Sequence, residues 1–491
     1  MKTPKHFALV IISTVLYLQL FSQAPTVWGE LKKGDCEVGF KLIETVDNSR
    51  VFNFSIEEKE YKPRPLRIHL WYPSKQKSEN YLTVDSYLKI CSEDFVPIVN
   101  LPVQLQKGLG NENLEQFSNK QTASILNAIP EYGNFPLIII GQGLYFESPL
   151  SHFILCEYLA SHGYIVATSA LFGTHNRLVN LNVQDLETQI RDMEFIIAEV
   201  KKQKITSSNK TGIIGFDLGG MSGMILTMRN PGIAAFISLD AGILYEHFSG
   251  LPGIHQNYNL DNFRVPWLHI TQSRFIQDSS IQTTMSKKKY GDNYLVTTNT
   301  TNHANFTSYS ICGIENPVPA YWGEIADDLE SVYIEICDYS KSFLDQYLKQ
   351  INIGLNPNKY EYLSTLFKKG CDNIIVEDDL INQIIVNGVK TVYPIIRERK
   401  RNFPSEPIIE ETKLNWLGYH FLYWWGREKE AIDVFKLLAE LYPDSLNAYD
   451  SLGESYYING QTDLAIINYE KSLELNPDNE NAKEMLLKLK N

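Results

Sequence analysis

The stretch from Thr211 to Gly220, TGIIGFDLGG, constrains the fold of this chain more than any other stretch. Its apolar first half favours a buried strand, and the apolar residues from Leu218 to Met228 favour a helix directly after it. A Gly-x-nucleophile-x-Gly turn between two such elements needs small residues at its ends, because it holds the central side chain in a strained conformation above the sheet edge. The central residue here is Asp217. The stretch therefore predicts a strand, a sharp turn and a helix that present Asp217.

Two later stretches place a carboxylate and a histidine after Asp217 in the chain. Phe236 to Asp240 has the pattern of a buried strand that ends in a carboxylate, and His303 follows the strand pattern of Tyr294 to Thr298 in the motif NHANF. The order nucleophile, acid, histidine along the chain is that of α/β-hydrolases. The chain most resembles the platelet-activating factor acetylhydrolase-like and dienelactone hydrolase-like branch, whose motif is Gly-x-Ser-x-Gly-Gly. The resemblance implies a catalytic triad of Asp217, Asp240 and His303, with Asp217 where the branch has Ser.

The resemblance also implies an oxyanion hole. Pro136 to Ile140 is a continuous apolar run, typical of a buried parallel strand, and Gly141-Gln142-Gly143-Leu144 follows it. Gln142 stands where the branch has His, but the expected donors are the backbone N–H groups of Leu144 and Leu218, which do not depend on that side chain. His175 and Arg177 follow another predicted strand, so we expect them to contact substrate.

Ser222 offers no substitute nucleophile. It lies five residues beyond Asp217 on the predicted helix. At 3.6 residues per turn, its side chain points roughly 140° away from the direction of Asp217. We therefore expect a structural role for this serine.

The first residues have the features of a secretory signal. Lys2 and Lys5 precede the apolar run Phe7 to Phe21, and small residues near Gln23 offer a cleavage site. The mature protein is therefore predicted to begin near Gln23 or Ala24 and to be secreted, periplasmic or otherwise extracytoplasmic. An uncleaved membrane anchor is the alternative, although the run is too short for a comfortable transmembrane helix, so no stable membrane span is expected.

The net charge and the cysteine pattern limit the kinds of partner and cofactor that the sequence predicts. The formal net charge of the chain is −13, and removal of the two signal lysines makes it −15. A chain this acidic, without a basic stripe, is not expected to bind nucleic acid. The six cysteines show no C-x-x-C motif and no metal-ligand spacing, so the sequence predicts neither a cofactor nor a metal site.

The C-terminal residues repeat with a period of 34. Gly426, Ala431 and Pro443 recur 34 residues later, and the aromatic Phe435 is matched there by Tyr469. Leu417-Gly418 recurs after 35, which places one extra residue near Tyr423 to Trp425. The period and the positions of the small, aromatic and proline residues resemble tetratricopeptide repeats. Such repeats present a surface for a protein or peptide partner.

With 491 residues, the chain is predicted to have more than one domain. We expect a signal peptide over 1–23, an α/β-hydrolase domain over 24–350, a helical connector over 351–412 and the repeats over 413–491. Residues 75–131 are a possible cap insertion, with a helix expected over Thr122 to Ile129. The predicted fold class is α/β, with a doubly wound, mostly parallel sheet, followed by an all-α module.

Three functions remain open at this stage. The first is a hydrolase of a small or lipid-like ester or related bond, with Asp217 in the nucleophile position. The second is chemistry of the epoxide hydrolase or haloalkane dehalogenase kind, in which Asp217 attacks carbon and His303, oriented by Asp240, activates water. The third is a catalytically inactive pseudohydrolase that binds partners through its repeats. The resemblance favours a hydrolase.

Overall fold

The computed structural model describes most of the chain. The described residues are 27–52, 62–94, 114–144, 148–241, 250–298, 301–311, 328–352, 354–355, 359–370, 377–402 and 408–490. The predicted signal segment lies outside them, as do residues 95–113 of the possible cap. The chain divides into two compact units, Met1–Asn373 and Ile374–Asn491.

The described residues of the first unit form one sheet of ten strands, in the order β10-β9-β8-β7-β6-β4-β5-β2-β1-β3. All neighbouring pairs from β5 to β9 in this order are parallel. The strand β2 is antiparallel to both β1 and β5, and β10 is antiparallel to β9. The strands are β1 (Glu37–Phe52), β2 (Lys62–Ser74), β3 (Ser124–Leu126), β4 (Leu137–Gly141), β5 (Ile165–Ser169), β6 (Thr211–Phe216), β7 (Ile233–Leu239), β8 (Trp267–Gln272), β9 (Asn293–Thr298) and β10 (Leu363–Lys368).

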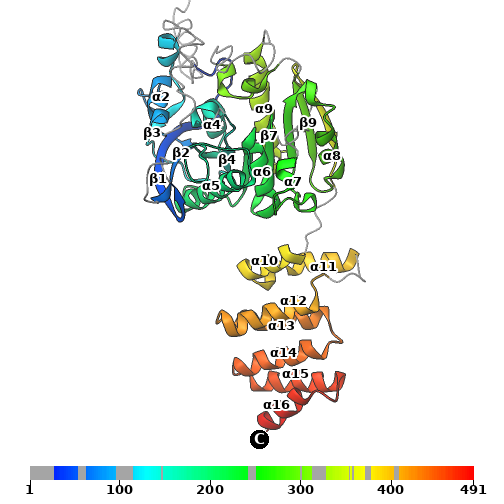
Figure 1. Cartoon of the computed structure of the whole chain (residues 1–491). Helices are drawn as coiled ribbons and strands as arrows, with labels where there is room; N and C mark the ends of the chain where they lie inside the picture. The colour runs from blue at the N-terminus through cyan, green and yellow to red at the C-terminus, as the bar shows by residue number, and fades with distance from the viewer. Residues whose placement is uncertain are drawn as a thin grey trace, which may run out of the picture. The chain divides into compact units, whose positions relative to one another are not determined.

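Helices cover both faces of this sheet (Figure 1). Successive strand residues point to opposite faces, so Ile139 packs in one core with α5, α6 and α8, while Ile138 packs in the other with α2, α4 and α9. The helical segments of this unit are α2 (Val84–Ser92), η1 (Pro149–His152), α4 (Phe153–Ser161), α5 (Val183–Lys202), α6 (Leu218–Arg229), α7 (Gly250–Gly253), η3 (Leu260–Asn262), η4 (Ser273–Phe275), α8 (Ser279–Lys287), η5 (His303–Phe306), η6 (Ser308–Ser310) and α9 (Leu329–Leu348). The predicted fold class, a doubly wound and mostly parallel sheet, is confirmed.

Two local expectations differ from the structure. The segment Thr122 to Ile129 is predicted as a helix but contains β3, which pairs in parallel with β1 at the edge of the sheet. The connector expected over 351–412 contains β10, which extends the sheet beyond β9. Both are edge strands. The strand β3 has only 3 residues, and only one of the six residues of β10 is buried. Neither therefore shows the alternation of apolar and polar residues that would indicate a strand in the sequence.

The second unit is all helical within its described residues. Its segments are α10 (Glu377–Asn387), η8 (Val389–Thr391), α11 (Tyr393–Asn402), α12 (Glu411–Tyr419), the π-helix η9 (His420–Trp424), α13 (Glu428–Leu441), α14 (Leu446–Ile458), α15 (Thr462–Leu475) and α16 (Glu480–Lys490). The π-helix falls where the repeat has one extra residue, and a π-helical turn accommodates such an insertion without ending the helix. Phe435 and Tyr469 pack against Gly418 and Gly453, as the repeat pattern predicts.

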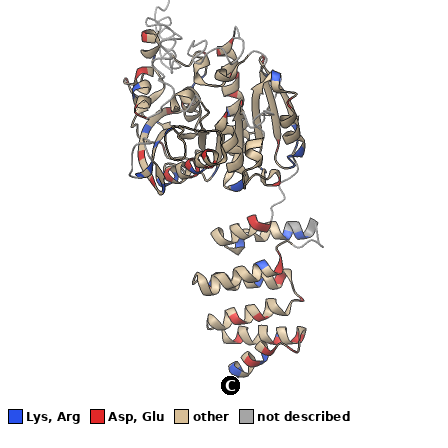
Figure 2. Cartoon of the chain, viewed as in Figure 1, with Lys and Arg blue, Asp and Glu red and all other residues tan. Residues whose placement is uncertain are grey.

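The distribution of charged residues and the length of the helices are relevant to which partners the protein can bind. In the view of Figure 2, basic and acidic residues are scattered over the described helices, and the basic ones form no continuous stripe. Across the described residues, no helix combines the length and the apolar character that a bilayer crossing requires.

Candidate active site

Asp217 stands at the sharp turn between β6 and α6, as predicted. Its φ of 49° and ψ of −115° are strained for a residue with a side chain, which is the conformation of a nucleophile elbow. The flanking glycines are required by space. A Cβ atom at Gly215 would lie 2.2 Å from the carbonyl oxygen of Gly219, and one at Gly219 would lie 2.1 Å from that of Gly141. Backbone packing therefore fixes the turn that presents Asp217 at the carboxyl edge of the sheet.

His303 and Asp240 form a hydrogen-bonded pair beside this turn. His303 Nδ1 lies 2.7 Å from Asp240 Oδ2, so it donates to the carboxylate and leaves Nε2 toward the elbow. Asp240 follows β7 and is fully buried. Thr271 Oγ1 and Gln272 Nε2, at the end of β8, donate to Asp240 over 2.7 and 2.6 Å. These donors fix the acid while it orients the imidazole.

The His303 ring faces Asp217 across a gap. Its Nε2 atom lies 3.9 Å from Asp217 Oδ1, which is longer than a hydrogen bond. Burial disfavours the imidazolium, but the hydrogen bond and charge of Asp240 outweigh it, and the pKa of His303 is raised above its usual value. Phe216 stacks on the ring, with centroids 4.6 Å apart. The structure thus brings the three predicted triad residues together.

The predicted oxyanion hole has an occupant from the chain itself. The Leu144 N–H donates to Asp217 Oδ2 over 2.9 Å. The Leu218 N–H, at the start of α6, also donates to the Asp217 carboxylate. Asp217 therefore places one carboxylate oxygen where a serine hydrolase would hold the oxygen of its substrate.

The Asp217 carboxylate is largely enclosed. Burial raises its pKa above the usual range, although the charge of His303 and the two backbone N–H groups act in the opposite direction. Its side chain keeps 17% exposure, so solvent or a small molecule can reach it. An enclosed carboxylate with an open side is suited to attack on a bound apolar substrate.

Behind the oxyanion loop lies a chain of amide and hydroxyl groups. Gln142 Nε2 donates to Thr168 Oγ1 over 2.9 Å, and the Gln142 carbonyl accepts from Gln189 Nε2 over 2.8 Å. Gln189 Oε1 accepts from Ser222 Oγ over 2.5 Å. Ser222 is therefore turned toward α5, as the helical spacing predicts. Gln142 supports the loop in place of the histidine of the resembling branch.

The two predicted substrate contacts lie in the loop after β5. His175 is exposed, with its Nε2 atom 3.2 Å from the Gln184 amide at the start of α5, and Arg177 is half-buried. The same loop is held by Asp185, which accepts from the Thr174 N–H over 2.8 Å. Contact of His175 and Arg177 with substrate stays a prediction.

Sequence reasoning missed some residues around the triad. Thr271 and Gln272 end a buried strand at the carboxyl edge, and polar residues in that position were the available signal. His152 is fully buried edge-on to Phe216, and burial lowers its pKa to about 3. The neutral His152 ring therefore forms part of the wall behind Phe216. A single histidine in an apolar sequence gives no signal of that position.

Comparisons with known proteins agree with this architecture. A solved structure of a ferulic acid esterase from Streptomyces cinnamoneus matches with a TM-score of 0.52 and 17% sequence identity, over 67% of this chain and 96% of that chain. The first unit has an α/β-hydrolase fold. At this identity the likeness shows the fold alone. A tetratricopeptide repeat family model matches residues 447–479, and no curated protein matches the chain in sequence.

Proposed function

We propose that this protein is a hydrolase in which Asp217 attacks a carbon atom of a small or lipid-like substrate and forms a covalent ester. The observation that carries this proposal is the position of the Asp217 carboxylate. Oδ2 is held by the Leu144 N–H, while Oδ1 faces the imidazole of His303. One oxygen is anchored and the other is available for attack.

Direct hydrolysis of an ester at its carbonyl carbon fits this geometry less well. The two backbone donors that would stabilise the substrate oxyanion already bind Asp217. Attack by a carboxylate on an acyl carbon would also give a reactive anhydride, beside a site whose own negative charge opposes the developing oxyanion. The same donors suit attack on a saturated carbon, because no tetrahedral oxyanion forms at the attacked carbon in that step.

The first step displaces a leaving group. An electron pair of Asp217 Oδ1 forms a bond to the substrate carbon, and the bond from that carbon to the leaving oxygen or halide breaks, with its electron pair going to the leaving atom. An epoxide oxygen then takes a proton from solvent water, whereas a halide leaves as the anion. The product is an alkyl ester of Asp217, whose carbonyl oxygen is Oδ2.

The second step uses the rest of the triad. His303 Nε2 removes a proton from water, and the oxygen of that water attacks the carboxyl carbon of Asp217. The charge that develops on the carboxyl group is stabilised by the Leu144 N–H, which binds Oδ2, and by the Leu218 N–H, while Asp240 stabilises the imidazolium. The alcohol then leaves with the proton from His303. One oxygen atom from water remains in the Asp217 carboxylate.

One observation favours a second candidate, an inactive pseudohydrolase that serves as a binding or scaffold protein. Burial raises the pKa of Asp217, and a protonated carboxyl group is a poor nucleophile. In that case Asp217 only fills the oxyanion hole of a former serine enzyme, and the repeats carry the function.

A mass measurement distinguishes these candidates. We expect a single turnover of an epoxide or haloalkane in ¹⁸O-water to place label in the Asp217 peptide. In His303→Gln the alkyl ester should accumulate and raise the mass of that peptide by the alkyl group, because water is no longer activated. His420→Gln, in the second unit, is the matched control and should behave as wild type. If no label enters and Asp217→Ser gains ester hydrolysis, the pseudohydrolase is supported instead.

We also propose where the protein is located, which family branch it belongs to and what it binds. The basic and apolar pattern of residues 1–23 supports export, and we propose a place in the acetylhydrolase-like or dienelactone hydrolase-like branch. His175 and Arg177 are proposed to contact the substrate, and the repeats to bind a protein or peptide. An intact Met1 on purified protein from the cytoplasm would contradict export.

A further inference from the structure

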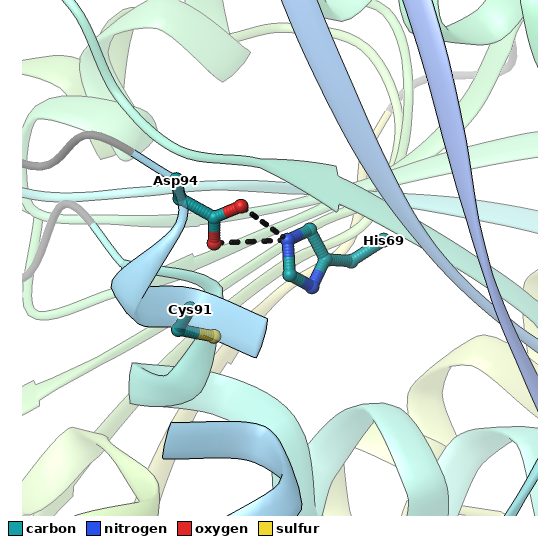
Figure 3. Close-up of side chains that lie close together, drawn as sticks. All are labelled: His69, Cys91 and Asp94. Carbon is teal, nitrogen blue, oxygen red and sulfur yellow. Dashed lines mark hydrogen bonds and ion pairs between the residues drawn. The ribbon is translucent and has the colours of Figure 1, made fainter. Parts of the chain in front are cut away.

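Three side chains that commonly bind transition metals lie together beside β2, with no triad residue among them (Figure 3). His69 is in β2, Cys91 is near the end of α2, and Asp94 comes two residues after that helix. One possible ligand atom of each lies within 4.8 Å of the other two. Figure 3 shows the Asp94 carboxylate facing one imidazole nitrogen, with the Cys91 sulfur on the same side of the ring.

The cluster leaves a buried oxygen unsatisfied. His69 Nε2 lies 3.0 Å from both oxygens of Asp94, but one ring nitrogen carries only one proton and can satisfy only one of them. Among the described residues, Asp94 Oδ2 has no hydrogen-bond partner. The Cys91 thiol is within hydrogen-bonding reach of Asp94 and of Ser148. Buried polar atoms are normally paired, so this oxygen indicates a missing ligand.

The charge of Asp94 is also poorly compensated. Asp94 is only 2% exposed, and the nearest cation is Arg67, whose Nη1 lies 3.5 Å from Asp94 Oδ1. Arg67 binds two other carboxylates more closely, those of Glu44 at 2.8 Å and Glu93 at 2.7 Å. A buried carboxylate requires a counter-charge, and a bound cation would supply it.

We infer that His69, Cys91 and Asp94 bind a zinc-class transition metal ion. A set of one nitrogen, one sulfur and one oxygen ligand suits Zn²⁺, whereas Mg²⁺ and Ca²⁺ take oxygen ligands. In a tetrahedral site with bonds of about 2.0–2.3 Å, ligand atoms are roughly 3.4–3.6 Å apart. Small side-chain rotations bring the cluster to that spacing. The ion displaces the thiol proton of Cys91, which passes to solvent, and the proton on Nε2 of the neutral His69 ring moves to Nδ1, so that Nε2 can bind the ion.

One ligand of the cluster lines a cavity. Asp94, but neither His69 nor Cys91, lines a cavity of about 660 Å³ whose wall also includes Arg67, Ser169 and Phe172, and no triad residue lines it. Thiolate and carboxylate balance the two charges of the ion. Three protein ligands leave a fourth coordination position for water or a small ligand.

Metal titration of the full-length protein tests this inference. Chelator-treated protein with reduced thiols should bind one Zn²⁺ per chain, and Co²⁺ in its place should give a thiolate-to-metal charge-transfer absorption band. Cys91→Ser should abolish the band, and Cys91→Ser and Asp94→Asn should each weaken Zn²⁺ binding by at least about tenfold. Ca²⁺ and Mg²⁺ should not compete.

Two other thiols provide controls. Cys156→Ser removes a fully buried thiol and Cys36→Ser a half-buried one, both outside the cluster, and each should retain the band and the affinity. Substoichiometric binding by wild type, or no charge-transfer band, would overturn the inference without any variant having to fold. Unchanged affinity in a folded Cys91→Ser protein would overturn it as well.

Discussion

Asp217 combines a strained backbone with an enclosed carboxylate. Its φ is positive, and the two N–H groups beside it hold a charge that burial opposes. Native structures keep such features where the surroundings determine them, as the close glycine contacts at Gly215 and Gly219 do here. The position is therefore expected to lower stability at neutral pH in exchange for a reactive group.

Asp217→Asn should reveal this through pH. Because burial raises the folded-state pKa of Asp217, wild type loses stability as pH rises from the unfolded-state pKa, about 3.9, to the folded-state value. Asparagine can keep an oxygen in the hole and carries no charge. The free energy of unfolding of the variant, relative to wild type, should therefore increase between pH 3 and pH 7, as measured by denaturant titration.

Asp47→Asn is the matched control, because its shift has the opposite sign. Burial opposes ionisation there too, but hydrogen bonds from Ser49 and Arg50 lower the pKa of Asp47. Its charged form therefore contributes stability above the unfolded-state pKa that is lost as pH falls. The relative stability of this variant should decrease between pH 3 and pH 7. The same trend in both variants would contradict the assignment of an enclosed, disfavoured charge to Asp217.

The His303–Asp240 pair makes a second prediction at this scale. Asp240 raises the pKa of His303, so the imidazole should titrate above its usual value of about 6.5 in wild type. In Asp240→Asn, burial still lowers the pKa of His303 and only the charge of Asp217 still raises it, so the titration should move to a lower pH than in wild type. NMR titration of the His303 ring protons in the two proteins measures the difference. An equal titration of His303 in the two proteins would show that the pair does not interact.

The sequence predicts the identities of the triad but not the state of the oxyanion hole. Asp217, Asp240 and His303 follow from motif and chain order, since elbow and strand ends meet at one sheet edge. Which oxygen the Leu144 N–H binds depends on a side-chain rotamer and a strained φ, which no pattern encodes. The sequence gives no signal of the cluster of His69, Cys91 and Asp94, because His69 lies in β2, whereas Cys91 lies in α2 and Asp94 just after it.

At the scale of elements, the repeats depend on glycines that admit aromatic rings. A Cβ atom at Gly418 in α12 would lie 2.4 Å from the Phe435 ring, whereas one at Gly453 in α14 would lie 3.1 Å from Tyr469. The first contact requires the helices to separate. The second is relieved by a shift of a few tenths of an ångström.

Gly418→Ala should therefore destabilise the repeats more than Gly453→Ala. Alanine gains about 1 kcal/mol in helix propensity, but the overpacking against Phe435 should cost more, for a net loss of about 1–2 kcal/mol. Gly453→Ala should be close to neutral. Urea unfolding followed by the fluorescence of Trp424, in η9, and of Trp425, directly after it, reports this unit. Greater loss in Gly453→Ala would refute the packing argument, and Gly418→Ala with Phe435→Leu should recover stability.

The sequence predicts an element well where the element's own residues form a pattern, and poorly where the element forms only by pairing with a neighbouring strand. The extra residue near Tyr423 was visible as a change of repeat spacing and became the π-helix η9. The central strands were visible as apolar runs because both of their faces are buried. The strands β3 and β10 exist through pairing with β1 and β9, and their own residues carry little signal.

At the scale of the molecule, the two units have separate cores. Among the described residues, the buried core of the second unit runs from Leu380 to Leu486, and the two cores that flank the sheet end at Leu363 and Leu295. A unit with its own core can fold alone. The boundary at residue 373 lies after β10, so the hydrolase unit includes the first part of the segment expected as a connector.

The length of a truncated chain should therefore decide its stability. A mature chain that ends at Asn373 keeps β10, where Phe367 packs on Tyr294 with ring centroids 4.8 Å apart, and should unfold at the midpoint of the full chain's first unit. A chain that ends at Gln350 loses β10 and leaves the edge of β9 unpaired. At about 1 kcal/mol for each ladder hydrogen bond, it should lose about 2 kcal/mol or more and tend to aggregate. Denaturant unfolding and light scattering measure both outcomes. The chain that ends at Asn373 should also keep any hydrolase activity, because Asp217, Asp240 and His303 all lie within the first unit. Equal stability of the two truncations would mean that β10 is dispensable, and loss of activity in a folded chain ending at Asn373 would assign the second unit a part in catalysis.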